Sequence, residues 1–406
     1  MRIQLISVTA PEWLGIFIGM IIGGLAEAWG ISNPEVLLRL GTWEDRLFVG
    51  CIAIAIGSGA LALYGLSALG VAFHWGVKPD YVVGVALGGA IFGTGIAISG
   101  YVPGTIWMAL GEGRRDAIYA VLGGLLGAAT WTVIYQTAFG NWLVTFMNLG
   151  QIYFGGQVGT NLDAGFLIAV VWAAIMFTVA YTLPRYKGGK SCAYVNTHKG
   201  YKLSEQETAR YEELAGVLLE GSSMPLGKEN LPEKVNHDWS VSSNLFGVVM
   251  LSVGVIIGLT VVLEMFLHQI FGESTTYSWM VAQLWLTPSA WRYSDVVVNT
   301  IGWEPFSDIG TLLGGFLASI FFTRRFQAFN NVIPPTWKAR FGNSQIKRAA
   351  GAFTGAYLML LGARMAGGCA SGHILSGDLQ MAVSSLEFFV FVMIFLLLVA
   401  RLIYTR

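Results

Sequence analysis

The chain has 406 residues, of which 54% are hydrophobic and only 12% are charged, about half the charged share of a soluble domain. Apolar segments of about 20 residues recur along it, which predicts an all-α polytopic membrane protein and excludes an ordinary soluble enzyme. The 24 basic and 24 acidic residues balance. No separate basic domain is present to bind nucleic acid, so the expected surroundings are a lipid bilayer.

Three cysteines, Cys51, Cys192 and Cys369, lie in unlike contexts and form no CxxC pair. The sequence therefore predicts neither a disulfide framework nor a zinc site, and we expect no metal and no cofactor. The N-terminus lacks the basic region and the cleavage site of a secretory signal peptide, so the first span is expected to remain in the mature protein.

Hydropathy predicts about nine transmembrane helices. They are expected at residues 13–30, 47–76, 81–98, 117–138, 160–184, 243–267, 307–326, 348–367 and 383–404.

Four shorter amphiphilic pieces lie between these spans, at 33–41, 103–112, 293–302 and 370–380. Each is too short to cross a bilayer, and each is flanked by Gly, Pro or charge. We interpret them as re-entrant half-helices. The alternative is an ordinary helix in an interfacial loop.

Residues 185–242 form the one long polar segment, with a capping-box pattern at Ser204 that predicts a short helix near 204–220. The sequence thus divides into a first membrane repeat (1–184), a linker (185–242) and a second membrane repeat (243–406). The link from Arg324 to Arg348 carries six basic residues and no acid, so it is expected on the cytoplasmic side. Counting spans from it places the linker and the C-terminus inside and the N-terminus outside a bacterial inner membrane.

An internal repeat is visible in two short matches. Glu35-Val-Leu-Leu with Trp43-Glu44 matches Asp295-Val-Val-Val with Trp303-Glu304 at an offset of 260, and 99–104 matches 367–372 at an offset of 268. The first copy would hold five spans and the second four. Because five is odd, the two copies face opposite ways, as in many transporters with a midplane site.

The stretch 362–377 contains five glycines inside an apolar run, together with an arginine, a thiol and a histidine. Glycines at this density disfavour a continuous helix. Irregular backbone at membrane depth requires protein or a water-filled cavity around it, so this stretch is predicted to line a path. Arg364 would attract an anionic substrate or donate to backbone carbonyls. The alternative is a structural ion pair with Glu264, Glu387 or Glu27.

Cys369 follows Gly368 at the start of a half-helix, where a thiolate would be favoured as a nucleophile or soft donor. The alternative is a small buried apolar residue. His373 lies four residues later and either donates to an anion or is a satisfied structural donor. Ser371 belongs to the same predicted path. The first repeat contributes its matching residues, which are Tyr101, Val102, Pro103 and Thr105.

At these residues the chain resembles the YeeE/YedE family of membrane proteins, whose members take up thiosulfate or related sulfur compounds. The run Gly-Gly-Cys-Ala-Ser-Gly-His-Ile-Leu-Ser-Gly at 367–377 matches the signature of that family. The segment from Asn33 to Asp45, and 99–105 with 111–113, resemble first-half motifs of its split or fused relatives. The resemblance covers both repeats, and it implies nine spans with four inserted half-helices.

Transporters of this family are thought to pass thiosulfate along three cysteines. Only Cys369 occupies such a position here, and Val102 stands where relatives usually carry cysteine. A relay of three thiols is therefore excluded in this chain.

These observations predict a non-enzymatic inner-membrane importer of a small inorganic sulfur anion, with thiosulfate as the first candidate. The alternative is a membrane sulfurtransferase, in which Cys369 would carry a persulfide to a cytosolic sulfurtransferase docked on 185–242. Flux of labelled thiosulfate in proteoliposomes would favour transport, and a protein-bound persulfide would favour the alternative.

Overall fold

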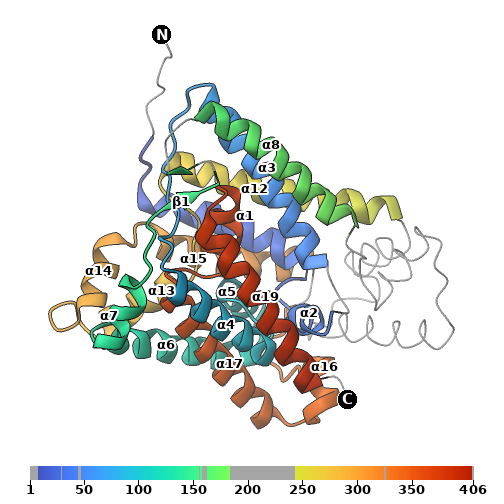
Figure 1. Ribbon diagram of the computed structural model, residues 1–406. Helices are drawn as coiled ribbons and strands as arrows, with labels where there is room; N and C mark the ends of the chain where they lie inside the picture. Colours follow the sequence, from blue (N-terminus) through green and yellow to red (C-terminus); the bar gives the residue numbers. More distant parts are fainter. Residues whose placement is uncertain are drawn as a thin grey trace.

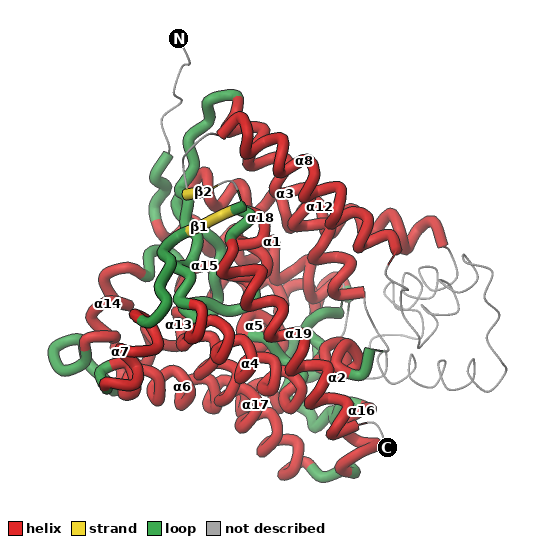
Figure 2. The backbone as a smooth tube through the Cα atoms, in the orientation of Figure 1, coloured by secondary structure: helices red, strands yellow, loops and turns green. Residues whose placement is uncertain are grey.

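A computed structural model describes residues 8–28, 30–43, 47–154, 156–157, 162–182, 243–323 and 326–404. The regular secondary structure of these parts is helical apart from a two-stranded antiparallel hairpin, β1 (Ile152–Tyr153) and β2 (Gly156–Gln157). Figures 1 and 2 show the helices gathered into one assembly, with segments from both halves of the chain interleaved. The polar linker, its expected helix near 204–220 and Cys192 lie outside the described residues.

The long helices follow the predicted spans closely. They are α1 (Gly15–Ala28), α3 (Leu47–Ala68), α4 (Val82–Ser99), α6 (Arg115–Tyr135), α8 (Leu162–Thr182), α12 (Ser243–Leu267), α15 (Glu304–Leu317) continued by η2 (Ala318–Phe322), α17 (Gln345–Met365) and α19 (Val383–Tyr404).

Six helical segments among the described residues are long and apolar enough to cross a membrane, so the chain is a multi-pass helical membrane protein. They are Phe48–Ala68, Val82–Gly111, Arg115–Tyr135, Gly165–Thr182, Glu304–Phe322 and Val383–Tyr404. The predicted number of nine stays a prediction. Helix α1 has only 14 residues, and α17 carries charge at both ends, with Lys347, Arg348 and Arg364.

One predicted boundary is wrong. The span expected at 47–76 ends as a helix at Ala68, and residues 71–80 form an extended connection. This connection is apolar because it packs inside the protein. The His74 amide donates to Met265 O (2.8 Å), and the Gly76 amide donates to Gln380 Oε1 (3.0 Å).

Short helices occupy all four predicted positions: α2 (Pro34–Gly41), α5 (Pro103–Gly111), α14 (Arg292–Thr300), and η3 (Ser371–Leu375) with α18 (Ser376–Leu379). Local sequence explains where they begin. Pro34 and Pro103 each occupy a first helical position, where a missing N–H costs nothing. The Asn33 side chain accepts a hydrogen bond from the Glu35 amide at 3.0 Å. Four further short elements were not predicted, namely η1 (Glu12–Leu14), α7 (Ala138–Thr145), α13 (Thr275–Leu284) and α16 (Pro335–Phe341).

Helices α4 and α17 pack directly on each other, and their glycines make reciprocal contacts. A Cβ on Gly88 would lie 2.6 Å from Gly362 O, and a Cβ on Gly362 would lie 2.5 Å from Gly88 O. Gly95 and Gly355 face each other in the same way, at 2.5 and 2.8 Å. Adding 267 to a residue number in α4 gives the corresponding residue in α17, so Gly88 corresponds to Gly355 and Gly95 to Gly362. The pair Gly88–Gly362 therefore corresponds to the pair Gly95–Gly355.

The packing of the surrounding helices shows the same correspondence between the two halves of the chain. Helix α17 packs on α6 and α4 packs on α19, while α1 packs on α15 and α12 packs on α3. Both central helices also end at a glycine with positive φ, Gly100 (75°) and Gly367 (79°), again 267 positions apart. The shift of 268 expected from the short motif match is therefore wrong by one residue. With the corrected shift, Val102 rather than Tyr101 corresponds to Cys369.

Candidate functional site

The loop that follows α17 holds Cys369 in the interior. Gly367 reverses the chain in the left-handed region (φ 79°), which favours glycine. Cys369 is only 1% exposed, and its sulfur lies 3.0 Å from Ser371 Oγ. The His373 amide donates to Cys369 O at 2.8 Å. The thiol is therefore fixed at the start of η3, enclosed by the second-repeat motif.

His373 braces this loop, as expected for a satisfied structural donor. Its Nε2 lies 2.9 Å from Ala366 O, and its Nδ1 lies 3.3 Å from Ser385 Oγ. The ring stacks on Phe388, with centroids 4.6 Å apart, and its edge closes over Gly368. Both ring nitrogens are thus occupied by protein in this conformation.

We expect His373→Ala to lower the free energy of unfolding by roughly 1–3 kcal/mol, because Ala366 O would be left buried without a donor. Thermal unfolding in detergent measures this change. His74→Ala is the control, since His74 is half-buried and its ring makes a single contact of 3.2 Å to Val8 O. Equal midpoints for the two variants would contradict the bracing role.

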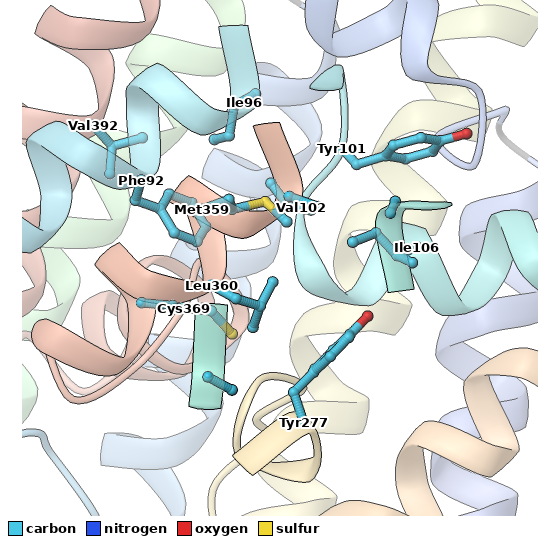
Figure 3. Packing of buried hydrophobic residues seen from close by; sticks show 14 of the residues in the cluster. Phe92, Ile96, Tyr101, Val102, Ile106, Tyr277, Met359, Leu360, Cys369 and Val392 are labelled. Carbon is cyan, nitrogen blue, oxygen red and sulfur yellow. The ribbon is translucent and has the colours of Figure 1, made fainter. Parts of the chain in front are cut away.

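The first-repeat motif faces the same interior from the other side. Thr105 Oγ1 accepts a hydrogen bond from the Val102 amide (2.9 Å) and donates to Val102 O (3.0 Å), which fixes the turn before Pro103. Val102 is 7% exposed and belongs to the same apolar cluster as Cys369. Figure 3 shows the Tyr101 ring directed away from Cys369. Val102 is thus the side chain that this motif presents towards the thiol.

Tyr101 is instead part of a buried basic cluster. Its hydroxyl accepts a hydrogen bond from Arg114 Nε at 3.3 Å, and the Arg348 guanidinium lies 5.6 Å from its ring centroid. Arg348 and Arg114 both pair with Asp116, at 2.6 and 3.4 Å. A cavity of about 260 Å³ lies beside this cluster, lined partly by Arg115, Asp116 and Arg348.

Arg364 lies in the last turn of α17 and is held by hydroxyl groups. Its Nε donates to Tyr293 Oη (2.8 Å), and its Nη1 donates to Ser274 Oγ (2.8 Å) and Thr275 Oγ1 (3.2 Å). It forms no ion pair within the part of the chain that the structure describes.

None of the three acids expected for a structural ion pair forms a salt bridge with Arg364 within the described residues. Glu264 accepts a hydrogen bond from Trp303 Nε1 at 2.9 Å, and Glu27 accepts one from Thr323 Oγ1 at 2.8 Å. Glu387 lies beside Asp80. Glu304 acts on Arg364 electrostatically without a salt bridge in the described part of the chain, so the guanidinium keeps positive charge that another anion can use.

Residues 41–397 of the chain match the family described as Sulphur transport. The chain belongs to the Sulphur transport family. The match covers both motif loops, and it confirms the resemblance to YeeE/YedE proteins. No curated protein sequence matches the chain at a significant level.

In this Sulphur transport protein, a second cation reaches the thiol loop and was not predicted as a site residue. Lys78 lies in the extended connection, and its Cε is 3.4 Å from the position that a Cβ on Gly368 would take. Its ammonium interacts electrostatically with Arg364, Glu304 and Cys369. Lys78 follows the predicted span 47–76, whose end was expected to be helical, so sequence reasoning did not connect it with the motif loops.

Several carboxylates also lie at this site, although no sequence motif predicts them. Glu304 Oε1 accepts hydrogen bonds from the amides of Thr275 and Thr276 and so caps α13. Glu273 occupies the space directly over Gly104, at the start of α5. Asp308 is 2% exposed on α15. These acids come from two short stretches, 273–276 and 304–308, which the folding of α13 against α15 brings together.

Tyr277 completes the group. It is fully buried, its ring packs on Trp107 with centroids 4.8 Å apart, and its hydroxyl has no hydrogen-bond partner among the described residues. It lies in electrostatic range of Asp308, Glu273 and Cys369, and Figure 3 places it in the same packed region as Cys369 and Ile106. The site thus offers a thiol, two cations and an unused hydroxyl donor where the two motif loops meet.

Proposed function

We propose that this protein imports a small sulfur-containing anion across the bacterial inner membrane, with thiosulfate as the preferred substrate. The observation that supports this proposal most is the pair of cations at the thiol loop, Arg364 and Lys78, of which Arg364 forms no salt bridge within the described residues. Membership of the Sulphur transport family supports a sulfur compound as the cargo. Sulfur oxyanions carry negative charge on oxygens that accept hydrogen bonds from guanidinium, ammonium and hydroxyl groups.

The proposed path runs between two inverted repeats, 1–184 and 243–406. The reciprocal crossing of α4 and α17 supports this division. The anion would meet Arg364 and Lys78, pass Cys369 beside Gly368 and Ser371, and leave past Val102, Pro103 and Thr105 towards the cavity at Arg348. The basic link between Arg324 and Arg348 supports a cytoplasmic C-terminus and an external N-terminus.

A handover of sulfur to a docked cytosolic protein has less support. Cys369 is 1% exposed, so a partner bound at the surface could not touch its sulfur in this conformation. A small anion that moves through the interior does not meet that obstacle.

The test is uptake of radiolabelled thiosulfate by proteoliposomes and growth of a transport-deficient host on thiosulfate as sole sulfur source. Arg364→Gln is expected to reduce uptake at low substrate concentration roughly 10- to 100-fold, because a hydrogen bond to a charged group contributes about 1.5–3 kcal/mol. Arg401→Gln, at an exposed position in α19, is the control. Wild-type protein that moves neither thiosulfate nor a competing sulfur anion would refute the proposed function.

A further inference from the structure

Glu273 stands between the two motif loops. Its carboxylate lies against Gly104, in the space that a Cβ at this position would need, and it hydrogen-bonds to Ser371 on the side of the thiol loop. The residue is 5% exposed, and its Oε1 has no hydrogen-bond partner among the described residues. The carboxyl group of Glu273 thus contacts both motif loops.

Asp308 lies one helical turn after Glu304 on α15, and its carboxylate is less well hydrogen-bonded than that of Glu273. Its carboxylate oxygens are buried, and among the described residues the Thr276 hydroxyl is the one donor beside them, without the alignment of a full hydrogen bond. The Tyr277 hydroxyl also lies near Asp308 and has no hydrogen-bond partner among the described residues. Two acids and two hydroxyls therefore share a buried region in which hydrogen-bonding capacity is unused.

The charges around this region do not balance when every acid is ionised. The facing groups are Glu264 from α12, Glu304 and Asp308 from α15, Glu273 and Tyr277 at α13, Cys369 from the thiol loop, Lys78 from the extended connection, and Arg364 from α17. Four carboxylates then face two cations, and an entering anion would be repelled. A buried carboxylate without donors is also costly in free energy. A proton on Glu273 and a second on Asp308 leave two carboxylates facing two cations, and both protonated groups supply an O–H donor for the anion.

We infer that uptake is coupled to protons that bind at Glu273 and Asp308 and travel with the anion. This inference rests on the proposed function. Each acid takes up a proton from the outer solution before the anion passes, and it releases that proton to the cytoplasmic side afterwards. No bond of the substrate is made or broken. For a dianion such as thiosulfate, two protons make the transfer electroneutral, so flux responds to the pH gradient and not to membrane potential.

Proteoliposomes with the wild-type protein test the coupling. An inward proton gradient is expected to concentrate radiolabelled thiosulfate, by about tenfold per pH unit for each coupled proton at equilibrium, or about 100-fold for two. A thiosulfate gradient should in turn draw protons inward, which a pH-sensitive dye records. Thiosulfate exchange and uptake without any response to pH gradient or proton movement would overturn the inference and leave the proposed function intact. Absence of all sulfur-anion flux would instead refute the proposed function itself.

Glu273→Gln and Asp308→Asn keep the shape of each side chain and remove the titrating group. Both variants are expected to retain thiosulfate counterflow while accumulation driven by the proton gradient falls to the level of protein-free vesicles. Glu12→Gln, at an exposed acid in η1, should accumulate as the wild type does. Glu273→Asp keeps a titrating group at this position and should accumulate thiosulfate as the wild type does. Gradient-driven accumulation that persists in the Gln and Asn variants would contradict the assignment of these two residues.

Discussion

Replacing Cys369 by alanine is expected to reduce thiosulfate uptake strongly while leaving the protein folded. Within the described part of the chain, Cys369 is the one cysteine where the motif loops meet, because Cys51 lies in α3. Its sulfur contacts Ser371 and is enclosed by the loop that His373 braces. Alanine removes only the sulfur and fits the same space, so the backbone of the loop should persist. Uptake by proteoliposomes should fall at least about tenfold, as for loss of an interaction of about 1.4 kcal/mol or more at a transfer barrier.

Cys51→Ala is the matched control, because Cys51 is equally buried (0% exposed) and packs against Gly254 of α12. It should retain uptake. Cys369→Ser separates two roles of the thiol. If the site requires only a polar group, serine restores uptake, and if it requires sulfur, serine behaves as alanine does. Wild-type uptake by Cys369→Ala would show that the anion does not depend on this loop.

The spans of the fold could be predicted because continuous apolar runs leave little alternative to helices. The bounds of α12 and α19, Ser243–Leu267 and Val383–Tyr404, agree with the predicted 243–267 and 383–404. Hydropathy gives a wrong prediction where an apolar run is not helical. Residues 71–76 pack as extended chain against α12 and Gln380, and hydropathy cannot distinguish such a buried connection from the end of a helix.

The candidate site was only half visible in the sequence. Cys369 and Arg364 stood out because a thiol and a cation among glycines are unusual in an apolar run. Lys78, Glu273 and Tyr277 gave no such signal, since each lies outside the predicted spans. Asp308 lies in the predicted span 307–326, where an acid is unusual, and this signal was missed. All four residues reach the thiol only through tertiary contacts between α13, α15 and the extended connection.

The alignment of the two proposed repeats depends on the offset between them, which the short motif match gave wrongly by one residue. Sequence matching aligned Tyr101 with Cys369, whereas the central glycines and the two positive-φ turns align Val102 with it. This one-residue correction matters for function. It places the apolar Val102, rather than Tyr101, at the position that corresponds to Cys369, and Tyr277 is the hydroxyl that lies near the thiol.

The second large effect is expected at the helix crossing that carries both motif loops. A Cβ at Gly362 would lie 2.5 Å from Gly88 O and 2.6 Å from Phe92 N, both of which are backbone atoms. Neither can move without shifting the axis of α4. Gly362→Ala should therefore destabilise the protein by about 3 kcal/mol or more, since overpacking costs about 1–3 kcal/mol even where side chains can adjust. This loss exceeds the gain of about 1 kcal/mol that alanine brings to a helix interior.

Gly65→Ala in α3 is the control for that gain. The atoms nearest to a Cβ there belong to the Phe166 side chain, at 3.4 and 3.9 Å, an ordinary contact. Its unfolding midpoint in detergent should equal or exceed that of the wild type, while that of Gly362→Ala should fall. Gly95→Ala tests the mirrored contact, since its Cβ would lie 2.5 Å from both Gly355 O and Met359 N. If the two halves are related by the exchange of α4 and α17, both variants must lose stability. Because these helices lead directly into Val102 and Cys369, both should lose uptake together. A stable, active Gly362→Ala protein would mean that the close crossing does not position the loops.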